Sequence, residues 1–433
     1  MLKREVFEQM VIWKDDQRRK PLILEGARQV GKTWLMKEFG RLHFEDVAYF
    51  NFDKNEALKN KFADTKEVAT IVERLSLLRK KLIESNKTLI IFDEVQECPN
   101  ALNSLKYFNE DGREYFVVSA GSLLGVYLAN QCAHPVGQVN ILKVFPLSFA
   151  EFLNATDNSL FAVYNKTPLD LSLLKVFHDK FIEAYKKYLI IGGMPESVNV
   201  WIETKDPQAV NKVHEEIQLI YERDFTKHHG KVEPERILMV YRNIPAQLSK
   251  QNNKFIYGDV QKGARARSFE TAIEWLVTAG LVNRIYRATK NESPLKSFRD
   301  LSGFKLYYFD TGLLASMAEV ESEQIILNKS YQFKGSLTEN YVLQQLSNLP
   351  WRTPAYYTFD DRYEIDFLVQ DKHGDIIPIE TKAGESVSST SFNAYNKKYN
   401  PKVRIRYSLL EYKKDNNVIN IPLYLVGKTL ELI

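Results

Sequence analysis

The sequence predicts an α/β protein whose first part is a mostly parallel sheet with helices on both faces. Short apolar runs typical of buried strands alternate with stretches of helical periodicity, and the first run leads directly into a glycine-rich loop and a helix. A content of 44% hydrophobic and 26% charged residues is ordinary for a globular protein and excludes a wholly disordered chain. The four expected strands are residues 21–24, 47–52, 88–92 and 115–118.

The length and composition favour a multidomain protein of the cytosol. With 433 residues and roughly 150 residues per domain, about three domains are expected. Two cysteines are too few for a disulfide framework, so we expect reducing, cytoplasmic surroundings. No stretch approaches the ~20 apolar residues of a membrane span, and the start lacks the apolar core of a signal peptide, so no membrane partner is expected. The predicted domains are residues 1–205, 206–330 and 331–433.

The loop after the first strand has a phosphate-binding pattern. Residues 26–33 read GARQVGKT, which matches GxxxxGK[ST] between a strand and a helix that we expect to end at Gly40. The glycines allow backbone N–H groups to face phosphates at a helix N-terminus. Lys32 would reach the β- and γ-phosphates, and the Thr33 hydroxyl would ligate Mg²⁺. The predicted nucleotide-binding residues of this loop are Gly26, Ala27, Arg28, Gln29, Val30, Gly31, Lys32 and Thr33.

Polar residues follow the third and fourth expected strands. Asp93 lies at the end of the third strand and is expected to hold Mg²⁺, directly or through water, while Glu94 is placed to polarise the attacking water. Two acids that only cap a strand are the alternative, and the neighbouring loop motif argues against it. Ser122 follows the fourth strand, where it could sense a γ-phosphate, although serine and glycine there are equally common in plain turns. The predicted cofactors are ATP and Mg²⁺.

Several segments together resemble one protein family. They are GARQVGKT, FDEVQECPN from Phe92, VVSAGS from Val117, FPLSFAEF from Phe145, GGMPE from Gly192 and YYFDTGLL from Tyr307. The chain resembles the prokaryotic AAA+ ATPases that carry an uncharacterised C-terminal domain, over nearly its whole length. The GGMPE and YYFDTGLL segments are the most specific. The resemblance implies ATP binding and hydrolysis, and AAA+ membership points to a homo-oligomeric ring that the sequence itself does not require.

The resemblance also implies an arginine that completes the nucleotide site. The candidate is Arg223, in the segment Tyr-Glu-Arg-Asp at residues 221–224. An arginine there would add positive charge as the γ-phosphoryl group departs. The alternative is a solvated helix arginine paired with Glu222 or Asp224, and both readings stay open.

Residues 236–299 form a basic segment. It contains twelve Lys and Arg against four Asp and Glu, a net charge of +8 in a chain of +4 overall. Helical patterns at 237–248, after Tyr257 and from Ser268, followed by a strand at 281–285, give a winged-helix outline, as the resemblance also implies. Cationic residues just before the third helix would position it on DNA phosphates; they are Lys262, Arg265 and Arg267. A winged helix that only packs between domains fits equally well.

The C-terminal segment has a second set of candidate residues. A helix at 337–346, a strand at 363–369, a turn at 371–374 and a returning strand at 376–382 look like the restriction-endonuclease-like PD-(D/E)XK nucleases. Asp366 and Glu380 would ligate Mg²⁺, Glu339 would add a ligand from the helix, and Lys382 would orient or deprotonate water. The alternative is a charged hairpin with an ordinary surface salt bridge.

These patterns lead to one functional interpretation and two rivals. The leading interpretation is an AAA+ ATPase coupled to a DNA-directed, nuclease-like C-terminal domain, in defence or mobile-element biology. The first rival is a nucleotide-switched scaffold whose C-terminal domain binds a partner without cutting nucleic acid. The second rival is a signalling ATPase without any nucleic-acid role.

Overall fold

The computed structural model describes residues 2–121, 124–126, 137–168, 170–226, 232–250, 252–329, 332–349, 353–385 and 389–433. The chain divides into two compact units. The N-terminal unit contains residues 3–145 and 278–280, and the C-terminal unit contains residues 146–277 and 281–433 together with the first two residues. The predicted divisions at 205/206 and 330/331 therefore both fall within the C-terminal unit.

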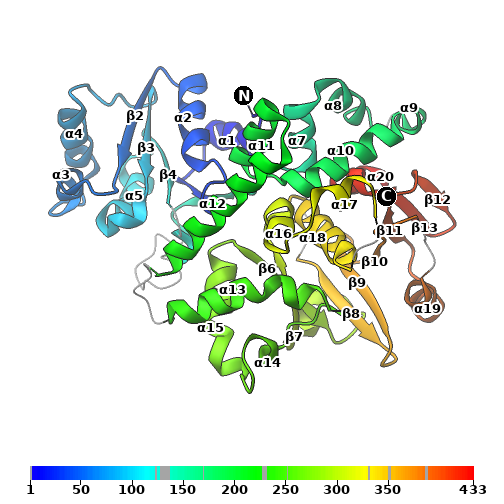
Figure 1. Ribbon diagram of the computed structural model, residues 1–433. Coiled ribbons are helices and arrows are strands. Elements are labelled where there is room, and N and C mark those ends of the chain that lie inside the picture. Colours follow the sequence, from blue (N-terminus) through cyan, green and yellow to red (C-terminus); the bar gives the residue numbers. More distant parts are fainter. Residues whose placement is uncertain are drawn as a thin grey trace. The chain divides into compact units, whose positions relative to one another are not determined.

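The N-terminal unit is built on a five-stranded sheet. Its strand order is β2-β3-β4-β1-β5, and all neighbouring strands are parallel. Figure 1 shows α2 on one side of this sheet and α3, α4 and α5 on the other, which confirms the predicted α/β arrangement with helices on both faces. The strands are β1 (Leu22–Glu25), β2 (Asp46–Asn51), β3 (Thr88–Asp93), β4 (Phe116–Ala120) and β5 (Asn140–Lys143).

The helices of this unit follow from apolar periodicity, with one difference from the prediction. They are α1 (Val6–Asp15), α2 (Lys32–His43), α3 (Glu56–Lys59), α4 (Val68–Arg79) and α5 (Pro99–Asp111). The expectation that the helix after the loop ends at Gly40 is wrong, because α2 continues to His43. A Cβ at Gly40 would lie 2.6 Å from the Val47 side chain, so this glycine allows close packing of α2 on the sheet.

The C-terminal unit combines many helices with a mixed sheet. Its helices are α7 (Phe149–Thr156), α8 (Asn158–Tyr164), α9 (Leu171–Val176), α10 (His178–Ile191), α11 (Pro195–Thr204), α12 (Pro207–Thr226), α13 (Pro234–Leu248), α14 (Tyr257–Val260), α15 (Ala266–Thr278), α16 (Thr311–Met317), α17 (Ser322–Ile326), α18 (Lys334–Leu346), α19 (Thr390–Tyr399) and α20 (Thr429–Leu432). The α13, α14 and α15 helices lie where the basic segment predicted three helices.

The sheet of this unit crosses the predicted border between the second and third domains. Its order is β12-β13-β11-β10-β9-β8-β6-β7. The hairpin β6–β7 joins the rest through a parallel pairing of β6 with β8, in which Arg287 lies opposite Tyr356. Backbone hydrogen bonds thus make one sheet of segments on both sides of residue 330. The strands are β6 (Val282–Ala288), β7 (Arg299–Tyr308), β8 (Ala355–Phe359), β9 (Tyr363–Gln370), β10 (Ile376–Thr381), β11 (Arg404–Ser408), β12 (Lys413–Asp415) and β13 (Val418–Pro422).

The two most specific sequence segments, GGMPE and YYFDTGLL, meet in the core of the C-terminal unit. The buried Asp310 carboxylate accepts hydrogen bonds from the backbone N–H groups of Gly193 at 2.7 Å and Leu313 at 3.0 Å. The side-chain amide of Gln344 on α18 donates to the same carboxylate at 3.2 Å. A Cβ at Gly312 would lie 2.4 Å from the backbone nitrogen of Gly192. The residue types in these segments therefore provide the hydrogen-bond donors of the buried Asp310 carboxylate and the close packing around it.

Candidate functional site

The loop between β1 and α2 has the geometry that its glycines allow. Gly31 has φ of 94° and caps the N-terminus of α2, and Gln29 has φ of 64°. A Cβ at Gly26 would lie 2.1 Å from the carbonyl oxygen of Val144, so only glycine fits this close approach. The loop consequently leads into a helix N-terminus of the kind that binds anions through backbone N–H groups.

Arg4 holds this loop from the N-terminal segment, and the sequence analysis missed it. Its guanidinium donates hydrogen bonds to the carbonyl oxygens of Val30 at 3.0 Å and Phe145 at 2.6 Å. Arg4 is buried. Because its acceptors lie 26 and 141 residues away, no local sequence pattern indicates this role.

Lys32 lies buried at the start of α2 with its ammonium turned toward the loop. Its Nζ donates to the carbonyl oxygens of Gly26 at 2.9 Å and Ala27 at 2.7 Å. Burial lowers the pKa of Lys32 to about 8, against the opposing effect of the Glu94 and Asp93 carboxylates. The lysine thus sits against weak, neutral acceptors that an anionic ligand could replace.

The two predicted Mg²⁺ ligands, Thr33 at the start of α2 and Asp93 at the end of β3, lie in direct contact. The Thr33 hydroxyl donates to Asp93 Oδ2 at 2.9 Å, and the Tyr49 hydroxyl donates to the same oxygen at 2.8 Å. Burial, together with the hydrogen bond to Asp93, raises the pKa of Tyr49 to about 12. Tyr49 comes from β2, the neighbour of β3, and its apolar surroundings in the sequence gave no reason to single it out. The hydroxyl and carboxylate oxygens are the donor types that Mg²⁺ prefers.

Glu94 has an unusual backbone conformation next to this group. Its φ of 51° lies in the left-handed region, which is uncommon for a residue with a side chain. Its Oε2 accepts a hydrogen bond from Gln96 at 2.7 Å. Such strained conformations cluster at functional sites, where the surrounding structure maintains them. Ser122, the other predicted residue of this region, lies outside the described residues.

Arg223 lies in the last turn of α12, within the C-terminal unit, and its side chain is exposed. One of its two proposed structural partners is engaged elsewhere, because Glu222 forms a bidentate pair with Arg242 at 2.8 and 2.7 Å. Its role as a finger arginine stays a prediction.

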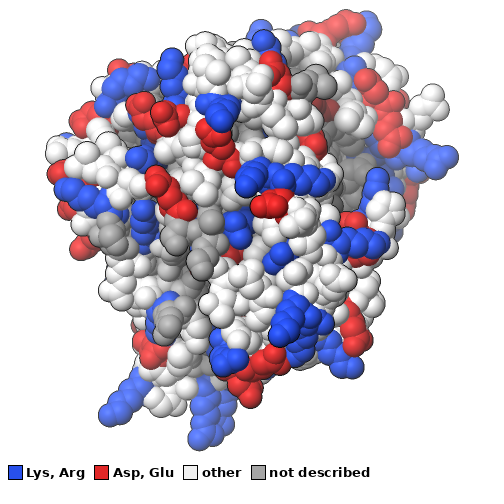
Figure 2. Space-filling view, turned by 90° about the vertical axis from the view of Figure 1, so that its right-hand side faces the viewer, with Lys and Arg blue, Asp and Glu red and all other residues white. Residues whose placement is uncertain are grey.

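The basic segment contains both paired and exposed cations. The Arg284 side chain is 7% exposed and forms ion pairs with Glu270 and Glu274, while Arg242 and Arg287 pair with Glu222 and Asp300. On the face drawn in Figure 2, basic and acidic side chains are interspersed. Much of the segment's positive charge therefore stabilises the fold. The exposed cations around the start of α15 are Lys262, Arg265 and Arg267.

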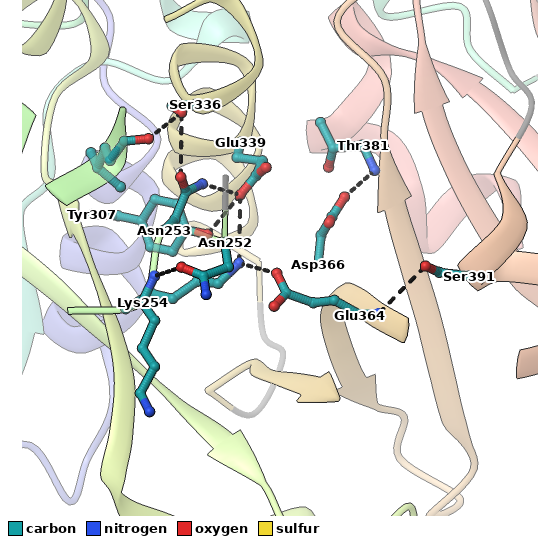
Figure 3. A network of polar contacts seen from close by, with 12 residues as sticks. Asn252, Asn253, Lys254, Tyr307, Ser336, Glu339, Glu364, Asp366, Thr381 and Ser391 are labelled. Carbon is teal, nitrogen blue, oxygen red and sulfur yellow. Dashed lines mark hydrogen bonds and ion pairs between the residues drawn. The ribbon is translucent and has the colours of Figure 1, made fainter. Parts of the chain in front are cut away.

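The second candidate site is a cluster of carboxylates in the C-terminal unit, which we call the carboxylate cluster. It consists of Glu339 on α18, Glu364 and Asp366 on β9, and Glu380 on β10. Figure 3 shows Glu339 bonded to Asn253 and Tyr307, with Glu364 and Asp366 beside them. Burial, followed by the charges of Glu380 and Glu339, raises the pKa of Asp366 well above its usual value. The structure thus brings the predicted acids into one electrostatically coupled group.

Lys305 on β7 enters this cluster. Its side chain is 1% exposed, and its Nζ lies 2.6 Å from Glu364 Oε1 and 4.0 Å from Glu339 Oε2. Burial disfavours its charge, but Glu339, Glu364 and Asp366 outweigh burial and raise the pKa of Lys305 above its ordinary value. Lys305 was not among the predicted site residues. A lysine between Phe304 and Leu306, in an otherwise apolar strand, is a sequence signal for a buried charge that needs a partner.

Lys382 lies at the other side of the cluster. Its Nζ is 2.6 Å from Glu380 Oε1, which also accepts a hydrogen bond from Ser389 at 2.8 Å. Asp366 Oδ2 accepts the backbone N–H of Thr381 at 2.7 Å. Among the described residues, no three His, Cys, Asp or Glu side chains are arranged to hold a metal ion. Among these predicted residues, Lys382 is therefore ion-paired with Glu380, and Asp366 accepts a backbone N–H.

Sequence comparison divides the chain into three matched segments. Residues 18–153 match the AAA domain family, residues 182–324 match a domain of unknown function, and residues 334–425 match another domain of unknown function. The match to the AAA domain family covers most of the N-terminal unit, whose parallel sheet and phosphate-binding loop agree with it.

One curated relative and several solved structures are similar to the chain. The uncharacterized protein MJ1544 of Methanocaldococcus jannaschii is 24% identical over 383 residues, which cover 87% of this chain and 78% of that protein. The Walker-type ATPase PABY2304 of Pyrococcus abyssi is 12% identical with a TM-score of 0.45, covering 73% of this chain and 96% of that one. The Aeropyrum pernix ORC1 protein, solved in complex with DNA, is 13% identical with a TM-score of 0.27, covering 73% and 91%.

Across the described part of the chain, each helix is too short or too polar to span a bilayer.

Proposed function

We propose that this AAA-type ATPase binds ATP at the loop of residues 26–33 and hydrolyses it with Mg²⁺. The observation that carries the proposal is the contact between Thr33 and Asp93 at 2.9 Å, directly beside the helix N-terminus and Lys32. A phosphate-binding loop and a carboxylate at the end of β3 are the two parts that P-loop NTPases require.

Each residue has a distinct part in the proposed reaction. The backbone N–H groups of the loop bind the phosphates, and the Lys32 ammonium moves from the Gly26 and Ala27 carbonyl oxygens to the phosphate oxygens. Thr33 and Asp93 would hold Mg²⁺, which would supply positive charge to the phosphates during the reaction. Glu94 orients the attacking water and accepts its proton as the water oxygen bonds to the γ-phosphorus. The bond between the γ-phosphorus and the β–γ bridging oxygen breaks, and ADP and phosphate leave.

The substitution Glu94→Gln tests this proposal. A general base contributes roughly 10²–10⁴-fold, so turnover should fall by about two orders of magnitude while ATP binding persists. Glu97→Gln is the matched control, because Glu97 is an exposed acid three residues further along the chain. Steady-state phosphate release and nucleotide binding by calorimetry are the measurements. Unchanged turnover in the Glu94 variant would remove Glu94 from its role as base.

A second proposed function is contact with nucleic acid by the C-terminal unit. The observation that favours it is the exposed cation group of Lys262, Arg265 and Arg267 around the start of α15. The order α13, α14, α15, β6, β7 supports assigning this part as a winged helix, which would place these cations on phosphates. Replacing all three residues by alanine should weaken DNA binding. It should also reduce the slope of the logarithm of the binding constant against the logarithm of the salt concentration by about three. Binding that is absent from the wild type even at low salt would favour the signalling ATPase instead.

The carboxylate cluster does not fit a Mg²⁺ site in its present arrangement. The elements α18, β9 and β10 support a restriction-endonuclease-like assignment, and that fold implies a metal held by Asp366 and Glu380. Lys305, however, already supplies a positive charge to Glu364 and Glu339 within the cluster. We therefore place no cleavage step there and propose that the C-terminal unit binds its partner without cutting it.

A further inference from the structure

The carboxylate cluster contains more negative groups than a protein interior ordinarily accepts without a cation. Four carboxylates from α18, β9 and β10 contribute to it: Glu380 is buried, and Glu339, Glu364 and Asp366 are half-buried. Carboxylates removed from solvent in this way are stable only when they are paired, hydrogen-bonded or bound to a metal. Glu364 and Asp366 are two residues apart on β9, so their side chains leave the same face of the strand. The cluster therefore requires positive charge at its centre.

Lys305 supplies that charge from another part of the chain. It lies on β7, whose partner strand β6 pairs with β8, while the acids lie on α18, β9 and β10. The Lys305 side chain is 1% exposed and forms its closest contact with Glu364 at 2.6 Å. Neutral donors complete the site on the same side, because Asn253 and Tyr307 both donate to Glu339 Oε2, at 3.0 and 2.9 Å.

One carboxylate oxygen of the cluster remains available. Glu380 is 5% exposed, and both of its recorded contacts, from Ser389 and Lys382, are made to Oε1. Its Oε2 is buried and has no hydrogen-bond partner within the part of the chain that the structure describes. A buried carboxylate oxygen without a donor is costly, so this oxygen is a ligand that a metal ion would gain once the Lys305 charge is removed.

We propose that the carboxylate cluster is a cation site whose occupant is the chain's own Lys305 ammonium, and that a divalent metal ion binds there only when this ammonium is removed. Lys305 thereby keeps the nuclease-like residues in a metal-free arrangement and ties the hairpin β6–β7 to the C-terminal strands. The proposal is independent of the ATPase site, which lies in the other unit.

The test measures Mn²⁺ binding to the full chain without nucleotide, by electron paramagnetic resonance of the free ion. The neutral variant Lys305→Met should gain one Mn²⁺ site that binds at least tenfold more tightly than any site in the wild type. The gain should disappear in the double variant Lys305→Met/Asp366→Asn. It should also be absent from Lys305→Arg, which keeps the positive charge.

A surface ion pair provides the matched control. Lys329 lies 2.8 Å from Glu323, and both side chains are more than half exposed. Lys329→Met therefore removes a lysine charge from a carboxylate without opening the cluster, and its Mn²⁺ binding should equal that of the wild type. If folded Lys305→Met gains no Mn²⁺ site, or if Lys329→Met gains the same one, the proposal is overturned.

A second comparison decides the question if Lys305→Met does not fold. Asp366→Asn should fold, because an asparagine oxygen can still accept the N–H of Thr381, which now donates to Asp366 at 2.7 Å. Wild type and Asp366→Asn should then bind Mn²⁺ equally, since Lys305 occupies the cluster in both. Weaker Mn²⁺ binding by Asp366→Asn would show that a metal shares the cluster with Lys305 and would overturn the proposal.

Discussion

The nucleotide loop and the carboxylate cluster use the same side-chain types with opposite results. In the loop, Lys32 donates to carbonyl oxygens, and Asp93 accepts from the hydroxyls of Thr33 and Tyr49. In the cluster, Lys305 is paired directly with Glu364. The pKa of Lys32 is accordingly lowered to about 8, whereas that of Lys305 is raised. A lysine close to carboxylates therefore favours an anion-binding site only where the lysine is not already ion-paired with those carboxylates.

The largest expected contrast comes from replacing each lysine by methionine. Lys305→Met leaves half-buried carboxylates without their cation, so the free energy of unfolding of the C-terminal unit should fall by about 1–3 kcal/mol. Lys32→Met loses no ion pair, so the N-terminal unit should keep its stability, while ATP turnover falls by at least about 10²-fold. Hydrogen exchange measured peptide by peptide separates the two units. Equal destabilisation of both units by their respective variants would contradict the comparison.

A smaller effect is expected in the pH dependence of nucleotide binding. Because the pKa of Lys32 is lowered to about 8, the nucleotide-free protein loses this proton as the pH rises above about 8. Phosphate binding favours the charged ammonium, so binding at pH 9 should take up close to one proton, and at pH 7 almost none. Affinity should therefore decline as the pH rises through this window.

Calorimetry in buffers of different ionisation enthalpy measures this proton uptake. Lys32→Arg is the control, because arginine stays protonated throughout and should bind without taking up a proton. Proton uptake that persists in the arginine variant would assign the linkage to another group.

The parts of the fold that the sequence predicted well are those determined by local pattern. Strands β1, β3 and β4 each contain a run of apolar residues because both faces of a central parallel strand are buried. Strand β5 was missed, since it lies at the sheet edge and Ile141 is 50% exposed, which leaves no continuous apolar run. The end of α2 was misjudged because the glycine at position 40 serves packing rather than termination.

The site residues that the sequence missed depend on contacts between distant segments. Arg4 donates a hydrogen bond to the carbonyl oxygen of Phe145, and Lys305 donates one to Glu364, which is 59 residues away. The three predicted acids Glu339, Asp366 and Glu380 lie near one another, but the cation beside them comes from a hairpin that the sequence placed in another domain. The pairing of Lys305 with Glu364 can be recognised only once the order of the strands in the sheet is known.

The smallest expected effect concerns the Tyr49 hydroxyl and sharpens the account of the nucleotide site. Tyr49→Phe removes one of the two hydroxyl donors to Asp93 Oδ2 and leaves the Thr33 donor in place. A single hydrogen bond to a charged group is worth about 1.5–3 kcal/mol, and solvent at this partly buried position should replace part of it. The N-terminal unit should therefore lose about 1 kcal/mol of stability, and ATP turnover at saturating Mg²⁺ should change less than about fivefold.

Thr33→Val is the contrasting variant, because Thr33 is the proposed metal ligand, and it should raise the Mg²⁺ concentration needed for half-maximal turnover. If Tyr49→Phe impairs Mg²⁺ dependence as strongly as Thr33→Val, Tyr49 orients Asp93 for the metal rather than only stabilising its charge.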